Sequence, residues 1–146
     1  MNILVSRCLL GEPCRYDGQS RPLSKIRQLE EAGHVLIPVC PEVAGGLATP
    51  RPPAERQKDG RVVNEAGEDV TEAYRKGADL AVTLARKYGC QAAILKAKSP
   101  SCGSGTIYDG TFSRSLVSGW GVAAEQLREL GLTIVDENGW QALLNR

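Results

Sequence analysis

The sequence is poor in aromatic residues and histidine and lacks long apolar runs, and each of these absences excludes a class of protein. Only 5% of its 146 residues are aromatic, and there is one histidine. No apolar run approaches the roughly 18–20 residues that a transmembrane helix needs. Met1 leads directly into a strand-like segment, without the charged and apolar regions of a signal peptide. We therefore expect a cytoplasmic protein with no membrane partner.

An excess of charge of one sign is also missing. Eighteen Lys and Arg residues stand against seventeen Asp and Glu residues, which leaves a net charge of +1. Such a balance produces no long-range field that would gather phosphates or anionic lipid. We therefore expect no broad nucleic-acid binding. The balance is in better agreement with a small-molecule substrate, and the oligomeric state stays open.

The chain does contain enough apolar sequence for a core. Hydrophobic residues make up 42% and charged residues 24%, as in ordinary globular proteins. A chain of this length removes roughly 68–70% of its unfolded surface from water on folding. We predict one domain over residues 1–146 that needs no disulfide for stability. Its five cysteines then indicate reduced thiols, metal ligands or redox chemistry.

Apolar runs typical of strands alternate with helical patterns along the chain. Expected strands lie at residues 3–6, 35–39, 92–95 and 132–135, and expected helices at 23–32, 122–130, 140–144 and between Asp69 and Gly89. Pro38 places the second strand at an edge or at its end, and Asp69 with Glu72 predicts a capping box. The alternation predicts an α/β, single-domain, three-layer Rossmann-like fold with a mainly parallel sheet of about four to five strands.

Two long segments are rich in residues that break regular structure. The stretch 40–60 contains four prolines and three glycines and is too rich in breakers for a helix or a central strand, and the stretch 96–121 is rich in Gly and Ser. Long loops inside compact domains are commonly functional, so we predict that both belong to a site. A small hairpin is expected around Arg61–Val63 with its turn at Gly67.

Position along the chain separates the cysteines into two groups. Cys8, Cys40 and Cys102 all follow predicted strands, so they lie in loops at the carboxyl edge of the sheet, where ligands bind in parallel α/β folds. Cys14 lies in the first of these loops and is a possible fourth member. Cys90 precedes a strand instead, and we expect it at the opposite edge as a small buried hydrophobe.

Three thiols at one edge admit three interpretations. They are buried apolar residues, zinc ligands or iron–sulfur ligands. Structural zinc sites usually contain close-spaced ligand pairs, but the sequence has no Cys-x2-Cys, and its one histidine, His34, precedes the second strand. An iron–sulfur cluster accepts cysteines that are scattered along a chain, and three thiolates on four irons would leave one iron open as a Lewis acid.

Polar residues beside the cysteines favour chemistry at this edge. Glu42 follows Cys40 by two residues and is a candidate general base, although a solvated loop carboxylate explains it equally well. Ser99 and Ser101 precede Cys102 and could orient a water molecule or serve as turn residues. Cationic residues that would offset the negative charge of a cluster also flank these loops: Arg7, Arg15, Arg51, Lys96 and Lys98.

The motifs in these loops occur in a recognisable order. They are Ser6-Arg7-Cys8-Leu9-Leu10-Gly11 with Arg15-Tyr16-Asp17-Gly18, then Cys40-Pro41-Glu42-Val43 with Gly46-Leu47 and Pro50-Arg51, then Ser99-Pro100-Ser101-Cys102-Gly103. Together they resemble the thiouracil desulfidase family over nearly the whole chain. The resemblance is specific for the family and leaves the physiological substrate open.

Membership in this family would imply an oxygen-sensitive [4Fe-4S] cluster held by only three cysteines, which correspond to Cys8, Cys40 and Cys102. It would also imply non-redox removal of sulfur from a thiolated pyrimidine, with Glu42 as the catalytic glutamate. The catalytic serine would be Ser99 or Ser101, with a slight preference for Ser101. For recognition of the planar base, the nearest loop candidates are Tyr16, Tyr108, Asp109 and Phe112.

Two rival functions remain from the sequence. Cys8 and Arg15 resemble the phosphate loop of small tyrosine phosphatases, but that loop has Cys-x5-Arg, whereas this chain has Cys-x6-Arg, and Pro13 removes a backbone donor. The other rival is a metal-binding or iron–sulfur module without desulfidase activity. A closed four-ligand site that includes Cys14 would favour it.

Overall fold

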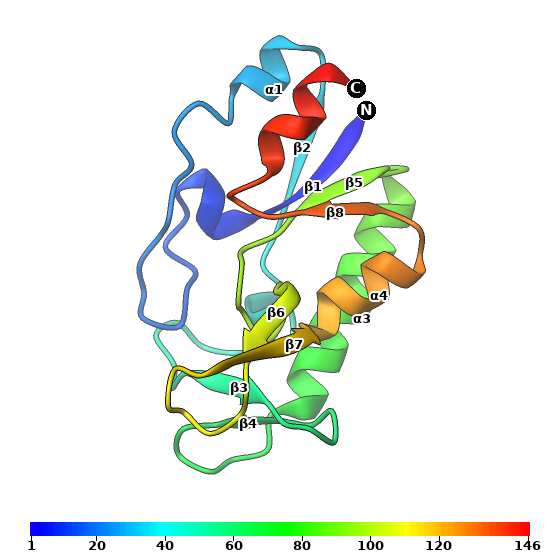
Figure 1. Ribbon diagram of the computed structural model, residues 1–146. Helices are drawn as coiled ribbons and strands as arrows, with labels where there is room; N and C mark the ends of the chain where they lie inside the picture. Colours follow the sequence, from blue (N-terminus) through cyan, green and yellow to red (C-terminus); the bar gives the residue numbers. More distant parts are fainter.

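The computed structural model describes residues 1–146, and its centre is a sheet of four parallel strands in the order β2-β1-β5-β8 (Figure 1). These strands are β1 (Asn2–Ser6), β2 (Val35–Val39), β5 (Ala92–Ile94) and β8 (Thr133–Val135). Pro38 is tolerated because β2 is an edge strand. The predicted α/β fold with a parallel sheet is confirmed.

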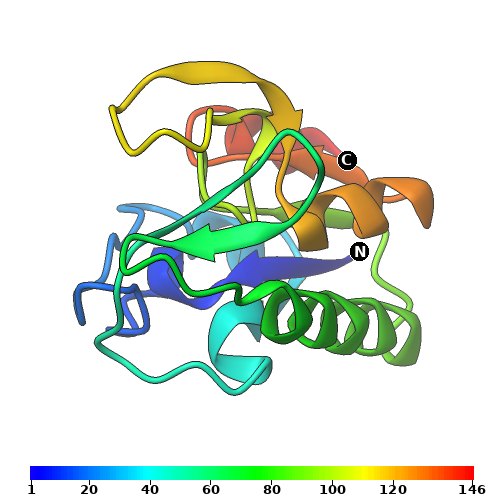
Figure 2. The same ribbon diagram turned by 90° about the horizontal axis from the view of Figure 1, so that it is seen from below.

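Helices cover both faces of this sheet (Figures 1 and 2). The α-helices are α1 (Gln28–Glu31), α2 (Pro41–Ala44), α3 (Thr71–Lys87) and α4 (Val122–Glu129), and the 3-10 helices are η1 (Arg7–Leu10) and η2 (Trp140–Asn145). Alternate residues of β1 supply two separate cores. Leu4 joins the core under α3 and α4, whereas Ile3 and Val5 join the core under α1 and η2.

Two antiparallel hairpins lie below the sheet in the view of Figure 1. One pairs β3 (Ala54–Arg56) with β4 (Val62–Asn64), and the other pairs β6 (Ser104–Tyr108) with β7 (Leu116–Trp120). The two segments predicted as loops, 40–60 and 96–121, therefore contain strands. Glycine inside β6 and β7 and three prolines just before β3 disguise the strand pattern in the sequence. The small hairpin predicted around Arg61–Val63 is present as an antiparallel bridge between Val63 and Asp69 across the turn at Gly67, and the same strand also pairs with β3.

Several helix predictions need correction. The helix expected over 23–32 is shortened to α1, because Lys25 has a positive φ of 68° that interrupts the helical path. The segment after Cys40 contains the one-turn helix α2, which begins at Pro41, a residue that the first turn of a helix tolerates.

The start of α3 also differs from the predicted capping box. Asp69 accepts bonds from the backbone N–H and the hydroxyl of Thr71, while Glu72 pairs with Arg75 instead of closing the box. No helix combines the length and the apolar character that crossing a bilayer requires.

The short helix α2 crosses α3 at very close range. A Cβ atom added at Gly77 would lie 1.8 Å from the carbonyl oxygen of Pro41, and one added at Gly45 would lie 2.0 Å from the carbonyl oxygen of Ala73. Both neighbours are backbone atoms, so they cannot move aside as a side chain can. The two glycines therefore allow α2 to lie against α3, and this contact fixes the position of Glu42 on α2.

We predict that Gly77→Ala destabilises the protein. The added methyl group would force α2 and α3 apart, and overpacking of this kind should lower the free energy of unfolding by at least about 2 kcal/mol. For a chain of this size, the midpoint of thermal unfolding should fall by roughly 4–8 °C. The matched control is Gly139→Ala, where the added Cβ would meet nothing within 4 Å. Equal midpoints for the two variants would contradict this packing account.

Candidate functional site: a cavity lined by cysteines

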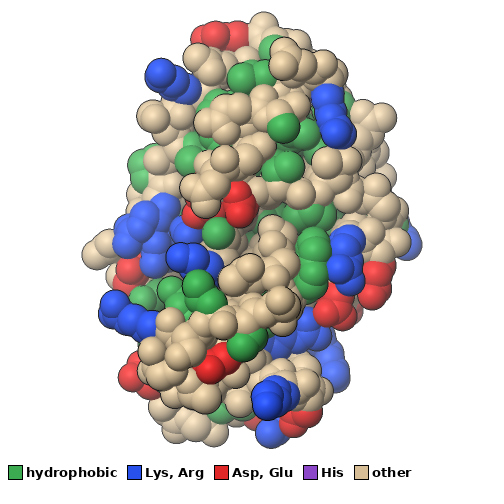
Figure 3. All heavy atoms as spheres, in the orientation of Figure 1, with side chains coloured by type: hydrophobic (Ala, Val, Ile, Leu, Met, Phe, Trp, Pro, Cys, Tyr) green, Lys and Arg blue, Asp and Glu red, His purple; other side chains and the backbone are tan.

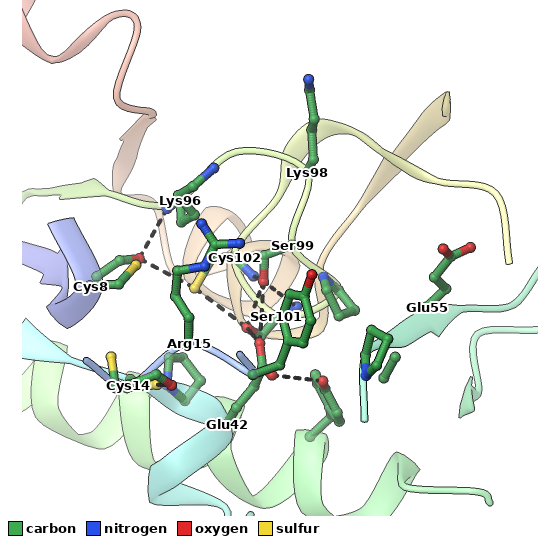
Figure 4. A pocket seen from close by; sticks show the side chains of 18 of the residues that line it. Cys8, Cys14, Arg15, Glu42, Glu55, Lys96, Lys98, Ser99, Ser101 and Cys102 are labelled. Atoms are coloured by element: carbon green, nitrogen blue, oxygen red, sulfur yellow. Dashed lines mark hydrogen bonds between the residues drawn. The ribbon is translucent and has the colours of Figure 1, made fainter. Parts of the chain in front are cut away.

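A cavity of about 710 Å³ opens at the carboxyl edge of the parallel sheet (Figure 4). Its walls come from the segments that follow β1, β2 and β5 and from the two hairpins. Parallel strands direct their following loops to one edge, so residues that are distant in sequence meet there. Both segments that the sequence singled out as site loops contribute to this cavity.

Four of the five cysteines line the cavity: Cys8 in η1, Cys14 in the loop that follows it, Cys40 at the start of α2, and Cys102 after β5. The structure thus brings together the three thiols named as candidates from the sequence and Cys14, the possible fourth member. Cys90 is buried in the core under α3 and α4, away from this group, as expected.

The cavity thiols lie in polar surroundings that hold them in place. Cys102 is 4% exposed, and its Sγ accepts hydrogen bonds from Ser6 Oγ at 3.3 Å and from Ser101 Oγ at 3.5 Å. Burial raises the pKa of Cys102 to about 12, against the lowering effect of these two hydroxyls. A hydrogen bond with Cys14, followed by burial, raises the pKa of Cys40. Without a bound cation these groups are neutral thiols, and metal binding would release their protons.

Glu42 is the centre of a hydrogen-bond network in the cavity. Its Oε1 accepts from Arg51 Nε and Nη2, at 3.1 and 3.0 Å, and from Tyr74 OH at 2.9 Å. Its Oε2 accepts from Ser101 Oγ at 2.9 Å and from Ser99 Oγ at 3.4 Å. One carboxylate oxygen is thereby bound by Arg51 and Tyr74, and the other accepts from the two serines.

Sequence reasoning missed Tyr74. It lies on α3 in a helical apolar stripe, where the sequence offers no signal that separates a core aromatic from a site residue. Burial and the neighbouring Glu42 charge keep the pKa of Tyr74 well above its ordinary value. Its hydroxyl therefore stays protonated and acts as a donor to the carboxylate.

The two serines differ in their partners. Ser99 Oγ accepts the backbone N–H groups of Ser101 and Cys102, both at 3.1 Å, and so caps the turn that presents Cys102. Ser101 is 1% exposed, and its hydroxyl lies between Glu42 Oε2 and Cys102 Sγ. Ser99 Oγ also lies 2.9 Å from Ser101 Oγ, so both hydroxyls belong to the network around Glu42 Oε2.

Positive charge surrounds this arrangement. In Figure 3, several Lys and Arg side chains form a group at the left of the face, and others lie at its right and lower edges. Those that line the cavity are Arg7, Arg15, Arg51, Lys96, Lys98 and Arg114, against the carboxylates of Glu42, Glu55 and Glu65. Lys98 and Arg114 form no ion pair within the chain, so their charges remain uncompensated. Such surroundings suit an anionic occupant.

The donor set fits an iron–sulfur cluster better than one metal ion. No group of three or more His, Cys, Asp or Glu side chains converges closely enough to hold a single ion. The cysteines instead line a wide cavity from three strand exits, and clusters are held by thiolates spread in this way. His34 takes no part in the site, because it is buried beside the amino end of the chain, where Nδ1 lies 2.9 Å from the Met1 nitrogen.

The hairpins form the wall of the cavity opposite the cysteines. Tyr108, Phe112 and Arg114 line it from β6 and the loop before β7, and Glu55 lines it from β3. In Figure 4, Glu55 lies across the cavity from Cys8 and Cys14, with Glu42 and Ser101 between them. Tyr16 also lines the cavity, whereas Asp109, another candidate from the sequence, does not. No pattern in the sequence points to Glu55.

Comparisons with known proteins point to one family. A family model described as 2-thiouracil desulfurase matches residues 3–139. The uncharacterized protein YbbK of Bacillus subtilis is 43% identical over 145 residues, which cover 93% of this chain and 95% of that protein. The solved structure of a [4Fe-4S]-dependent thiouracil desulfidase, TudS, is 46% identical, with a TM-score of 0.91 over 97% of this chain and 94% of the other. The chain belongs to the 2-thiouracil desulfurase family of enzymes, as its motifs indicated.

Proposed function

We propose that the chain is a [4Fe-4S]-dependent desulfidase that converts a thiolated pyrimidine such as thiouracil into the oxo base and hydrosulfide. The observation that carries this proposal is the contact chain from Glu42 Oε2 through Ser101 Oγ to Cys102 Sγ, inside a cavity shared with Cys8 and Cys40. It places a carboxylate and a hydroxyl within reach of a candidate cluster ligand. Family membership supports the same reaction.

The residues that would hold the cluster are Cys8, Cys40 and Cys102, one from each strand exit. With three protein ligands, a bound [4Fe-4S] cluster would supply an open iron, a Lewis acid suited to a soft sulfur atom. The lysine and arginine side chains around the cavity would stabilise the negative charge of the thiolates. Cys14 is left outside this ligand set.

The reaction exchanges sulfur for oxygen without transfer of electrons. A water oxygen forms a bond to the thiocarbonyl carbon, the carbon–sulfur bond breaks, and sulfur leaves as hydrosulfide. Glu42 Oε2 takes a proton from the attacking water, because its other oxygen is occupied by Arg51 and Tyr74. Ser101 positions the water through its hydroxyl. Arg51 and Tyr74 hold the carboxylate at the angle that this transfer requires.

The five free cysteines and the cavity of about 710 Å³ indicate the cellular compartment and the size of the substrate. We place it in the cytoplasm, where thiols are kept reduced. The cavity has a volume in the range typical of small-molecule sites. A free base or another small thiolated compound is the substrate class that we propose.

Glu42→Gln should separate catalysis from cluster binding. The amide keeps the size of the side chain but cannot accept the proton, so turnover of thiouracil should fall by about 10²–10⁴-fold. Iron content and the visible spectrum of the anaerobically prepared variant should match those of the wild type. The control is Glu30→Gln, because Glu30 is exposed on α1, pairs with Arg27 and does not line the cavity. Unchanged turnover in the Glu42 variant would remove this residue from the mechanism.

Alanine variants of the two serines should differ in kind. Ser101→Ala should retain the cluster and lose turnover, because it removes the hydroxyl between Glu42 and Cys102. Ser99→Ala should instead lower thermal stability and iron retention, since two backbone N–H groups lose their acceptor. The measurements are sulfide release, iron content and the unfolding midpoint for each variant. Exchanged phenotypes would assign the catalytic role to Ser99.

Serine variants of the cysteines should define the ligand set. Each of the variants Cys8→Ser, Cys40→Ser and Cys102→Ser should fail to bind iron. Cys14→Ser and the core control Cys90→Ser should retain four irons and desulfidase activity. Loss of the cluster in Cys14→Ser would indicate a closed four-thiolate site. That result would favour the alternative of an iron–sulfur module without desulfidase activity.

A further inference from the structure

Glu55 is a buried carboxylate that the proposed reaction does not use. It lies on β3, is 9% exposed, and faces the cavity on the side away from the cysteines (Figure 4). No lysine or arginine forms an ion pair with it. A buried charge without a cation requires other compensation, so the partners of Glu55 indicate what it does.

Those partners are backbone N–H groups of the other hairpin. Glu55 Oε1 accepts from the N–H of Gly110 at 2.9 Å and from that of Phe112 at 3.1 Å. Gln57, the residue that follows β3, donates from Nε2 to the carbonyl oxygen of Gly110 at 3.2 Å. Hydrogen bonds to a charged acceptor are the stronger kind. The first hairpin thus holds the loop 109–115 between β6 and β7.

This loop has a backbone conformation that needs such support. Phe112 has a φ of 57° and Arg114 a φ of 61°, both in the left-handed region that residues other than glycine avoid. Phe112 and Arg114 also line the cavity, as does Tyr108 at the end of β6. The conformation held by Glu55 is therefore the one in which these side chains face the cavity.

We propose that Glu55 is a positioning residue for substrate binding, because it fixes the loop 109–115 as the wall against which the pyrimidine ring of the substrate lies. Phe112 and Tyr108 supply aromatic surface for a planar ring. The inference rests on the proposed function in naming the ring as a thiolated pyrimidine. Glu55 itself acts through the loop and takes no part in the proton transfer assigned to Glu42.

Two substitutions of Glu55 test this role. Glu55→Ala removes the acceptor, so the loop should lose its fixed conformation and the KM for thiouracil should rise about tenfold, with kcat within about twofold of wild type. Glu55→Gln retains a carbonyl oxygen for the two N–H groups and should restore most of the affinity. Hydrogen exchange at the amides of Gly110 and Phe112 should be faster in the alanine variant and close to wild type in the glutamine variant.

A double-mutant cycle separates this role from general stability. If Glu55 acts through Phe112, then Glu55→Ala combined with Phe112→Ala should raise KM little more than Phe112→Ala alone. The matched control is Glu125→Ala, which breaks the ion pair between α4 and Arg56 of the same strand β3 but leaves the loop 109–115 untouched. Its KM and its amide exchange at Gly110 should equal those of the wild type.

The outcomes distinguish failure of this inference from failure of the proposed function. Faster exchange without a change in KM would show that the loop is not a substrate wall, and unchanged exchange would show that Glu55 does not hold it. Either result overturns the inference while desulfidation stands. If the wild type releases no sulfide, the proposed function fails, and the dissociation constant of 2-thiouracil, measured by calorimetry, replaces KM in the same comparison. Absence of any binding would overturn both.

Discussion

The ion pair between Glu42 and Arg51 is the interaction on which the site depends. The two side chains are 14% and 7% exposed, so both charges are largely removed from water. Removal of one partner from such a pair leaves an uncompensated buried charge, which typically costs about 3–5 kcal/mol. Tyr74 adds a donor from α3, and the serines before Cys102 add donors from the loop after β5. One carboxylate therefore joins α2, α3 and two loops of the cavity.

The architecture explains how these parts meet. Parallel strands direct the segments after β1, β2 and β5 to one edge, where the candidate ligands converge. The glycine contacts between α2 and α3 then bring Glu42 within reach of Tyr74. The two hairpins cover the remaining side of the cavity, and contacts between β3 and β6 join them. The fold supplies the position of each group, while the chemistry resides in a few side chains.

Much of this arrangement was predictable because it follows from local rules. Buried apolar runs predicted all four parallel strands, and Pro38 predicted that β2 lies at an edge or ends there. The order of the strands along the chain placed Cys8 and Cys40 at one edge of the sheet. Other features depend on tertiary contacts. The one-turn helix α2 is stabilised by its packing on α3, and the hairpins contain glycines and follow prolines that obscure their pattern. Tyr74 and Glu55 acquire their roles only from partners more than 30 residues away.

The central claim is that this cavity exchanges the sulfur of a thiolated pyrimidine for an oxygen atom of water. The most direct measurement is anaerobic turnover of 2-thiouracil by the iron-loaded protein in water enriched with oxygen-18. The account predicts that each uracil formed carries one heavy oxygen and that one equivalent of sulfide is released with it. An iron-loaded protein that releases neither uracil nor sulfide would contradict the claim, and uracil without heavy oxygen would contradict attack by water.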